Sequence, residues 1–225
     1  MTQIKRYLLD FIKEDLKKRM VFIGGPRQVG KTTLSLQLVG ASDKTHPAYV
    51  NWDFIKDKKN IVISGATSSG KTTFLNSCIG QIPSHERLIT LEDTYEIDVS
   101  HQNLVRLKSL KKSGNQTATV TMQDLVQASL RLRPDRIIMG EIRGREIFDF
   151  VSACSTGHSG ALATIHANNP RVAFMRMAQL YKLNKVSGMS DADIHRELHE
   201  VIDIVVQLQK TNEGRRLVEV YYKES

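Results

Sequence analysis

Two stretches of this chain have the glycine, lysine and threonine spacing that can cradle a phosphate group. They are Gly25-Pro-Arg-Gln-Val-Gly-Lys-Thr32 and Gly65-Ala-Thr-Ser-Ser-Gly-Lys-Thr72, and both fit the pattern G-x-x-x-x-G-K-[ST]. In such a loop the glycines let backbone N–H groups point at phosphate oxygens, the lysine supplies positive charge, and the threonine hydroxyl can ligate magnesium. Nucleotide phosphate chemistry is therefore the leading interpretation.

Each loop follows a short apolar run and precedes an apolar helical pattern, which is the strand-loop-helix context that the motif requires. The first loop contributes the candidate binding residues Gly25, Gly30, Lys31 and Thr32. The second contributes Gly65, Ala66, Thr67, Ser68, Ser69, Gly70, Lys71, Thr72 and Thr73. A complete core of this kind takes about 150 residues, so only the second loop has room for one.

Acidic residues follow two apolar runs downstream of the second loop. Glu92 and Asp93 end one run, and Glu141 ends another. Hydrolysis of a bound nucleotide needs carboxylates at neighbouring strand ends that organise magnesium and orient water. Thr72, Glu92 and Glu141 are therefore candidate metal ligands, and the two glutamates are candidate catalytic residues. The alternative is that these acids are solvated charges.

A histidine occupies a third expected strand end. His166 follows the apolar run that ends at Ile165, and an imidazole there can reach a terminal phosphate oxygen. A single histidine is more often a structural residue, so spacing alone leaves this role open.

The apolar periodicity predicts the elements that must position these residues. A helix over 3–19, a strand over 20–24, a helix over 31–39 and a short strand over 49–52 form one β-α-β unit before the polar run 53–59. Beyond it we expect strands at 60–64, 87–91, 103–108, 136–140, 160–165, 203–209 and 216–222. Helices are expected at 71–79, 122–132, 144–154, 170–181 and 190–201.

This alternation predicts a three-layer α/β core with a mostly parallel sheet. The last two strands should form a hairpin around Asn212-Glu-Gly214, and polar Gly114–Thr119 should be a surface loop.

The composition is that of an ordinary globular protein of 225 residues, with 40% hydrophobic and 25% charged residues. There is no apolar run near the ~18 residues of a membrane span and no signal-peptide pattern, so a soluble protein is expected. Cys78 and Cys154 lie in apolar helical stretches and are expected to be reduced core residues. The net charge of +8 suits an anionic partner but is also common on solvated surfaces.

From Asn60 to about Ser225 the chain resembles the type II/IV secretion-system ATPases, the traffic ATPases of conjugation and type IV secretion, and in particular the ATPase of VirB operons. The resemblance rests on the second loop, Leu91-Glu-Asp93, Leu130-Arg-Leu-Arg-Pro-Asp-Arg136, Gly140-Glu-Ile-Arg143, and Gly157-His-Ser-Gly160 with Thr164-Ile-His-Ala167. It implies a RecA-like P-loop NTPase with ATP and Mg²⁺ as ligands. It also implies a hexameric ring at the cytoplasmic face of the inner membrane, where secretion-apparatus proteins would be its partners.

The resemblance also implies residue roles. Lys71, Thr72 and Thr73 would bind phosphates and magnesium. Glu141 would be the Walker B acid and Glu92 the acidic-box carboxylate. His166 would sense the γ-phosphate with support from His158. Arg131 and Arg133 lie in the family's arginine-containing segment, where they could meet phosphate or pair with acids.

Residues 1–53 resemble a different family, the start of an archaeal and bacterial AAA-type ATPase, through Phe22–Thr33 and Tyr49–Asp53. We therefore expect a truncated AAA-like unit over 1–53, a junction over 54–59 and the secretion-type domain over 60–225. Lys31 and Thr32 could bind phosphate without supporting turnover. Traffic ATPases carry an N-terminal domain of different sequence, and we expect that domain to be absent from this chain.

The predicted function is an ATP-hydrolysing motor of a type IV secretion or conjugation-type system, cytoplasmic or peripheral on the inner membrane. One alternative is a remnant that binds nucleotide without hydrolysing it and acts as an interaction module. Another is a nucleic-acid-dependent motor, which the positive charge favours and the aromatic content of only 6% disfavours.

Overall fold

The computed structural model describes residues 7–16, 31–38, 40, 58–110, 119–186, 188–212 and 214–223. The expected strands over 20–24 and 49–52 lie outside these residues, as do Gly25 and Gly30 of the first loop. The junction is described only from residue 58 onward, and the polar loop only at Thr119.

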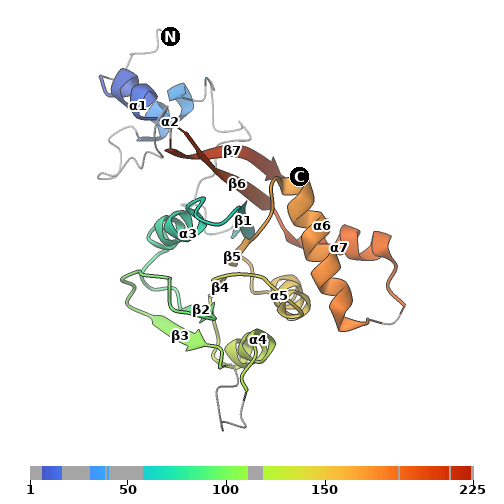
Figure 1. Cartoon of the computed structure of the whole chain (residues 1–225). Coiled ribbons are helices and arrows are strands. Elements are labelled where there is room, and N and C mark those ends of the chain that lie inside the picture. Colours follow the sequence, from blue (N-terminus) through green and yellow to red (C-terminus); the bar gives the residue numbers. More distant parts are fainter. Residues whose placement is uncertain are drawn as a thin grey trace.

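A seven-stranded sheet forms the centre of the chain (Figure 1). Its strands are β1 (Ile61–Gly65), β2 (Leu88–Glu92), β3 (Leu104–Lys108), β4 (Arg136–Met139), β5 (Leu162–Ile165), β6 (Ile204–Thr211) and β7 (Gly214–Tyr222). Their spatial order is β3-β2-β4-β5-β1-β6-β7. All neighbours pair in parallel except β6 and β7, which form an antiparallel hairpin. The predicted mostly parallel sheet is confirmed.

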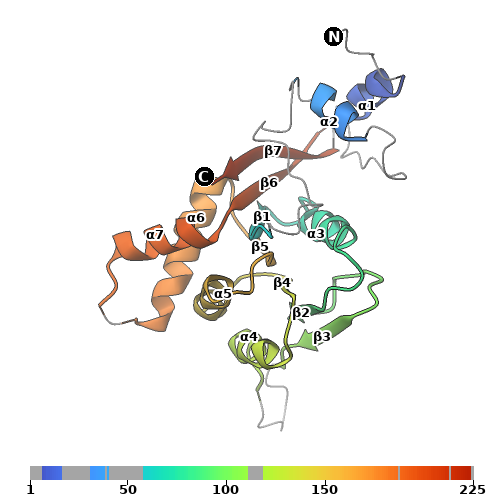
Figure 2. The same cartoon turned by 180° about the vertical axis from the view of Figure 1, so that it is seen from behind.

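Helices cover both faces of this sheet (Figures 1 and 2). They are α3 (Lys71–Ile79), α4 (Met122–Arg131), α5 (Glu146–Ser155), α6 (Pro170–Tyr181) and α7 (Asp191–Val201), with a short 3₁₀ turn at Lys182–Asn184. Leu75 and Ile79 of α3 pack on one face. The other four helices bury their apolar side chains against the opposite face. Strands β1, β2, β4 and β5 are buried along their whole length, which explains their continuous apolar runs.

Among the boundaries that differ from the sequence prediction, two have clear local reasons. Helix α5 begins at Glu146 rather than near 144, because the Glu146 carboxylate accepts hydrogen bonds from the N–H groups of Arg143 and Gly144 at 2.6 and 2.7 Å. Strand β7 begins at Gly214 rather than 216, because Gly214 pairs with Thr211 across the hairpin.

The amino ends of three strands are tied together by one buried side chain. The Asn60 side-chain oxygen accepts from the N–H groups of Gly160 and Ala161 at 2.9 and 3.1 Å, and its amide donates to Val201 O at 2.9 Å. The Asn60 backbone N–H donates to Asp203 at 2.7 Å. These bonds join β1 to the starts of β5 and β6, so they set the relative heights of the central strands.

Two short helices are described in the N-terminal part, α1 (Leu9–Leu16) and α2 (Lys31–Leu38). Leu9 and Ile12 of α1 cluster with Leu34 of α2. Apolar spacing in the sequence places Phe11 and Ile12 on one face of the predicted first helix, and this is only partly confirmed, because Ile12 is buried but Phe11 is 70% exposed. The helix at 31–39 is confirmed over its described residues.

Neither cysteine among the described residues forms a disulfide, as predicted. Burial raises the pKa of both the Cys78 and the Cys154 thiol to about 12. None of the helices in the described part of the chain has the length and apolar character of a membrane span.

Candidate active site

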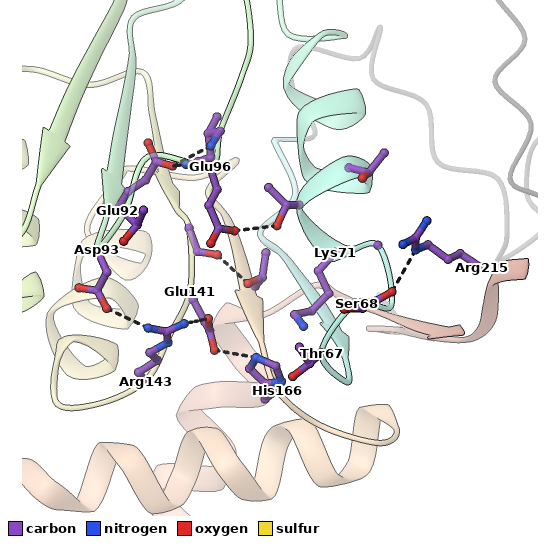
Figure 3. Close-up of a pocket in the computed structure, with 17 residues that line it drawn as sticks. Thr67, Ser68, Lys71, Glu92, Asp93, Glu96, Glu141, Arg143, His166 and Arg215 are labelled. Carbon is purple, nitrogen blue, oxygen red and sulfur yellow. Dashed lines mark hydrogen bonds and ion pairs between the residues drawn. The ribbon is translucent and has the colours of Figure 1, made fainter. Parts of the chain in front are cut away.

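Four strand ends meet at one edge of the sheet and bring the main candidate residues together. The phosphate-binding loop follows β1, Glu92 closes β2, Glu141 follows β4 and His166 follows β5. They line a cavity of about 420 Å³ (Figure 3). Parallel strands place their carboxyl ends at the same edge, which is where ligands bind in open α/β sheets.

The backbone of the phosphate-binding loop requires glycine at both ends. Gly70 has a φ of +97°, and a Cβ there would lie 2.9 Å from Arg215 Cδ. A Cβ on Gly65 would lie 2.6 Å from a backbone oxygen of β6. Ser68, between them, also has a positive φ of 61°. The loop therefore turns tightly enough for α3 to begin at Lys71.

The first turn of α3 is open to a ligand. Gly70 is the N-cap and offers no side chain, so no side-chain oxygen caps the N–H groups of this turn. Helices α4, α6 and α7 are each capped by a side chain, from Thr121, Asn169 and Ser190. A helix N-terminus attracts phosphate through these N–H groups and the helix dipole. The uncapped turn and the adjoining cavity fit the phosphate groups of a nucleotide.

Lys71 lies at the base of the loop. Its Nζ donates to Gly65 O and Ala66 O at 2.9 and 3.0 Å, and its side chain is buried. Burial lowers the pKa of Lys71, although the negative charges of Glu141 and Glu96 act in the opposite direction. Both hydrogen-bond partners are neutral carbonyls, so a phosphate oxygen would be the stronger partner for this ammonium group.

Glu141 is held between a guanidinium and an imidazole. Its Oε2 accepts from Arg143 Nη2 at 2.5 Å, and its Oε1 lies 3.1 Å from His166 Nε2. Arg143 also bonds Asp93 at 3.1 Å. The hydrogen bond that Arg143 donates to Glu141, followed by the charges of Glu141 and Asp93, raises the pKa of Arg143 against the effect of burial. The orientation of the Glu141 carboxylate is thus set from both sides.

The Glu92 carboxylate holds the segment that follows β2 in place. Its side chain is 1% exposed, and its Oε1 accepts from the backbone N–H groups of Glu96 and Ile97, both at 2.8 Å. Its Oε2 accepts from Arg106, which also donates to Ile97 O at 2.8 Å. Glu92 therefore fixes the segment that follows β2. This segment carries Glu96, whose Oε2 accepts a hydrogen bond from Thr72 Oγ1 at 3.3 Å.

Buried polar residues support the strand end that carries His166. Thr164 Oγ1 donates to Gly140 O at 2.6 Å, which joins β5 to the turn before Glu141. Gln207 of β6 donates to Ala167 O at 3.3 Å and accepts from the Ser64 hydroxyl. Such satisfied buried networks rigidify the groups that they hold.

Three residues predicted to bind from segments other than the two glycine-rich loops do not line the cavity. His158 belongs to the turn before β5, at the opposite end of that strand from His166, and its N–H donates to Ala153 O at 3.2 Å. Arg131 ends α4 and Arg133 follows it before β4, and both are exposed. The structure does not bring them to the phosphate-binding loop, so their roles stay predictions. In the first loop, α2 includes Lys31 and Thr32, but the Lys31 side chain lies outside the described residues.

The sequence prediction gave no role to three charged residues that line the cavity, Glu96, Arg143 and Arg215. Arg143 stands in the same motif as Glu141, and Glu96 lies four residues after Glu92, so their spacing was a usable signal. Arg215 had no such signal, because the β6–β7 hairpin brings it beside Ser68 from 147 positions away.

A parallel sheet, a glycine-rich loop before a helix N-terminus, a lysine at its base and acids at neighbouring strand ends together define a P-loop NTPase fold. The family model described as Type II/IV secretion system protein matches residues 16–221. The chain belongs to this family.

Individual relatives agree with this assignment. A type IV secretion system protein VirB11 from Bartonella quintana is 38% identical over 183 residues, covering 78% of this chain and 51% of the relative. The VirB11 protein of Bartonella henselae is 34% identical over 236 residues, covering 99% and 66%. The solved VirB11 ATPase of Brucella suis, in complex with sulphate, has a TM-score of 0.67 at 27% identity, also covering 99% and 66%. The chain spans about half the length of several relatives.

Proposed function

We propose that this chain is an ATP-binding, Mg²⁺-dependent ATP-hydrolysing motor domain of a type IV secretion or conjugation-type system. The observation that carries the proposal is the meeting of Lys71, Glu141 and His166 around one cavity at the carboxyl edge of the sheet. Family membership adds that relatives of this chain are secretion-system proteins.

The described residues divide the work as follows. The uncapped first turn of α3 and Lys71 hold the phosphates, and they stabilise charge that develops on them. Thr72 and Glu96 would hold a magnesium ion, which would shield phosphate charge when it is bound. Among the described residues, no three His, Cys, Asp or Glu side chains are grouped so as to hold a metal ion by themselves. Magnesium bound to a nucleotide usually takes several of its ligands from phosphate and water.

Glu141 and His166 face the terminal phosphate. Glu141 orients the attacking water, and the His166 imidazole, 3.1 Å from Glu141, senses the oxygens of that phosphate. Glu92 acts indirectly, because its carboxylate is used to hold the loop that carries Glu96. Homo-oligomeric, ring-type assembly and contact with secretion-apparatus proteins at the membrane are part of the proposal, drawn from the family.

The test is Mg²⁺-dependent ATPase activity of the whole chain, with ATP binding measured on the same samples. We expect Lys71→Ala to lose both binding and turnover. Glu141→Gln should keep ATP binding and lose turnover by roughly 100-fold or more. Lys31→Ala is the matched control in the first loop and should retain turnover.

Two results would redirect the proposal. ATP binding without turnover in the unaltered chain would favour the nucleotide-binding interaction module. Turnover that rises with added single-stranded DNA or RNA, and falls steeply with salt, would favour the nucleic-acid-dependent motor.

A further inference from the structure

Arg215 reaches the phosphate-binding loop from the far end of the chain. Its Nε donates to Ser68 O at 3.0 Å, and Ser68 is the residue of the loop with a positive φ of 61°. The arginine stem also packs on Gly70, where an added Cβ would lie 2.9 Å from Arg215 Cδ. Strand β7 therefore braces the loop at its one non-glycine residue with a positive φ.

The charge of Arg215 is unbalanced within the described part of the cavity. Arg143 is paired with Asp93 and Glu141, and the Glu92 carboxylate is paired with Arg106. The hydrogen bond that Arg215 makes there ends on a neutral carbonyl. Since Arg215 lines the cavity, its guanidinium is a cation available to an anionic ligand.

The position of Arg215 indicates which part of a nucleotide it would meet. In Figure 3, Glu141 and His166 lie on one side of Lys71, and Arg215 lies on the other side, beside Ser68. A terminal phosphate must lie near Glu141 for water to attack it. An arginine on the far side of Lys71 is then placed for the inner phosphates, which remain after hydrolysis.

We infer that Arg215 is a nucleotide-binding residue, whose guanidinium bonds an inner phosphate while its Nε braces the loop. This inference rests on the proposed function. It makes the β6–β7 hairpin part of the nucleotide site. The affinities for ATP and for ADP should therefore depend on Arg215 to the same degree. A contact to the terminal phosphate would change the affinity for ATP alone, because ADP lacks that phosphate.

The experiment is calorimetric titration of the whole chain with Mg-ATP and Mg-ADP, at low and at high salt. Arg215→Gln should weaken binding of both nucleotides by roughly tenfold, as expected for a lost charge-assisted hydrogen bond. The loss should shrink at high salt. Arg215→Lys keeps the charge and should recover part of the affinity. Lys210→Gln is the matched control, because Lys210 is an exposed cation directly opposite Arg215 on β6 and does not line the cavity.

Each outcome decides between the inference and its alternatives. Wild-type affinity in Arg215→Gln would overturn it, and so would a loss confined to ATP. A loss that is the same at low and high salt, and that Arg215→Lys does not relieve, would assign Arg215 to bracing alone and overturn the phosphate contact. Failure of the unaltered chain to bind either nucleotide would instead refute the proposed function.

Discussion

Thr72 Oγ1 donates a hydrogen bond to Glu96 Oε2 across 3.3 Å, so the hydroxyl that we propose as a magnesium ligand faces a carboxylate. The segment that carries Glu96 is held by the buried carboxylate of Glu92. The two glutamates therefore have different tasks: Glu92 positions the segment, and Glu96 faces the site.

This division predicts different effects for the two acids. Glu96→Gln should raise the Mg²⁺ concentration needed for half-maximal ATPase activity, because a neutral amide binds the ion and its water less strongly. The unfolding temperature should change little, since Glu96 reaches only an exposed hydroxyl. A magnesium titration of steady-state turnover measures the first effect.

Glu92→Gln is the comparison. It removes the buried negative charge and replaces one of the two accepting oxygens with an NH₂ donor, so either the backbone N–H groups of Glu96 and Ile97 or the Arg106 guanidinium loses its acceptor. It should therefore lower stability as well as turnover. If Glu96→Gln left the magnesium dependence unchanged and Glu92→Gln shifted it without loss of stability, Glu92 would be the metal-facing acid.

Asn60 should be a main determinant of stability at the other edge of the sheet. Asn60→Ala removes one acceptor and one donor that are buried between three segments, and it leaves the N–H groups of Gly160 and Ala161 unsatisfied. The expected loss is about 3 kcal/mol of unfolding free energy. Urea unfolding followed by circular dichroism measures it. The control is Gln102→Ala, which removes an exposed amide and should change the free energy of unfolding by less than about 0.5 kcal/mol. A similarly small change in Asn60→Ala would contradict the role given to Asn60.

The two thiols should be nearly inert in the folded chain. A pKa of about 12 for both Cys78 and Cys154 leaves very little thiolate at pH 8, and the thiolate is the reactive form. We expect reaction with a disulfide reagent to be at least roughly 100-fold slower than in denaturant. The rate should rise with pH in the alkaline range. Rapid labelling of the native chain at pH 8 would show that one of the helices opens readily.

The boundary near residues 53–59 remains a prediction about domain organisation. If residues 1–53 and 60–225 are separate bodies, limited proteolysis should cut first within 53–59 and leave a stable C-terminal fragment. Mass spectrometry of the early fragments tests this. Even cutting across the chain, or resistance at 53–59, would count against the boundary, and the family match from residue 16 makes the test informative.

From residue 60 onward the sequence alone determined the helices and strands and most of the site. The continuous apolar runs of β1, β2, β4 and β5 can only be satisfied in a sheet buried on both faces, and each is followed by a residue type with chemical use. The residue pattern by itself therefore places Glu92, Glu141 and His166 at one edge of the sheet. Helices α4 and α7 also begin within one residue of their predicted starts, where the side chains of Thr121 and Ser190 cap them.

Tertiary structure alone decided which charged groups face one another. Nothing local in the sequence shows that Glu92 turns inward to hold backbone N–H groups, that Arg143 bridges Asp93 and Glu141, or that Arg215 arrives from β7. The same applies to His158, which is close to His166 in sequence but lies at the other end of β5. Apolar periodicity reports on burial of a segment, whereas the pairing of polar side chains depends on strand order and loop path, which arise only when the whole sheet is assembled.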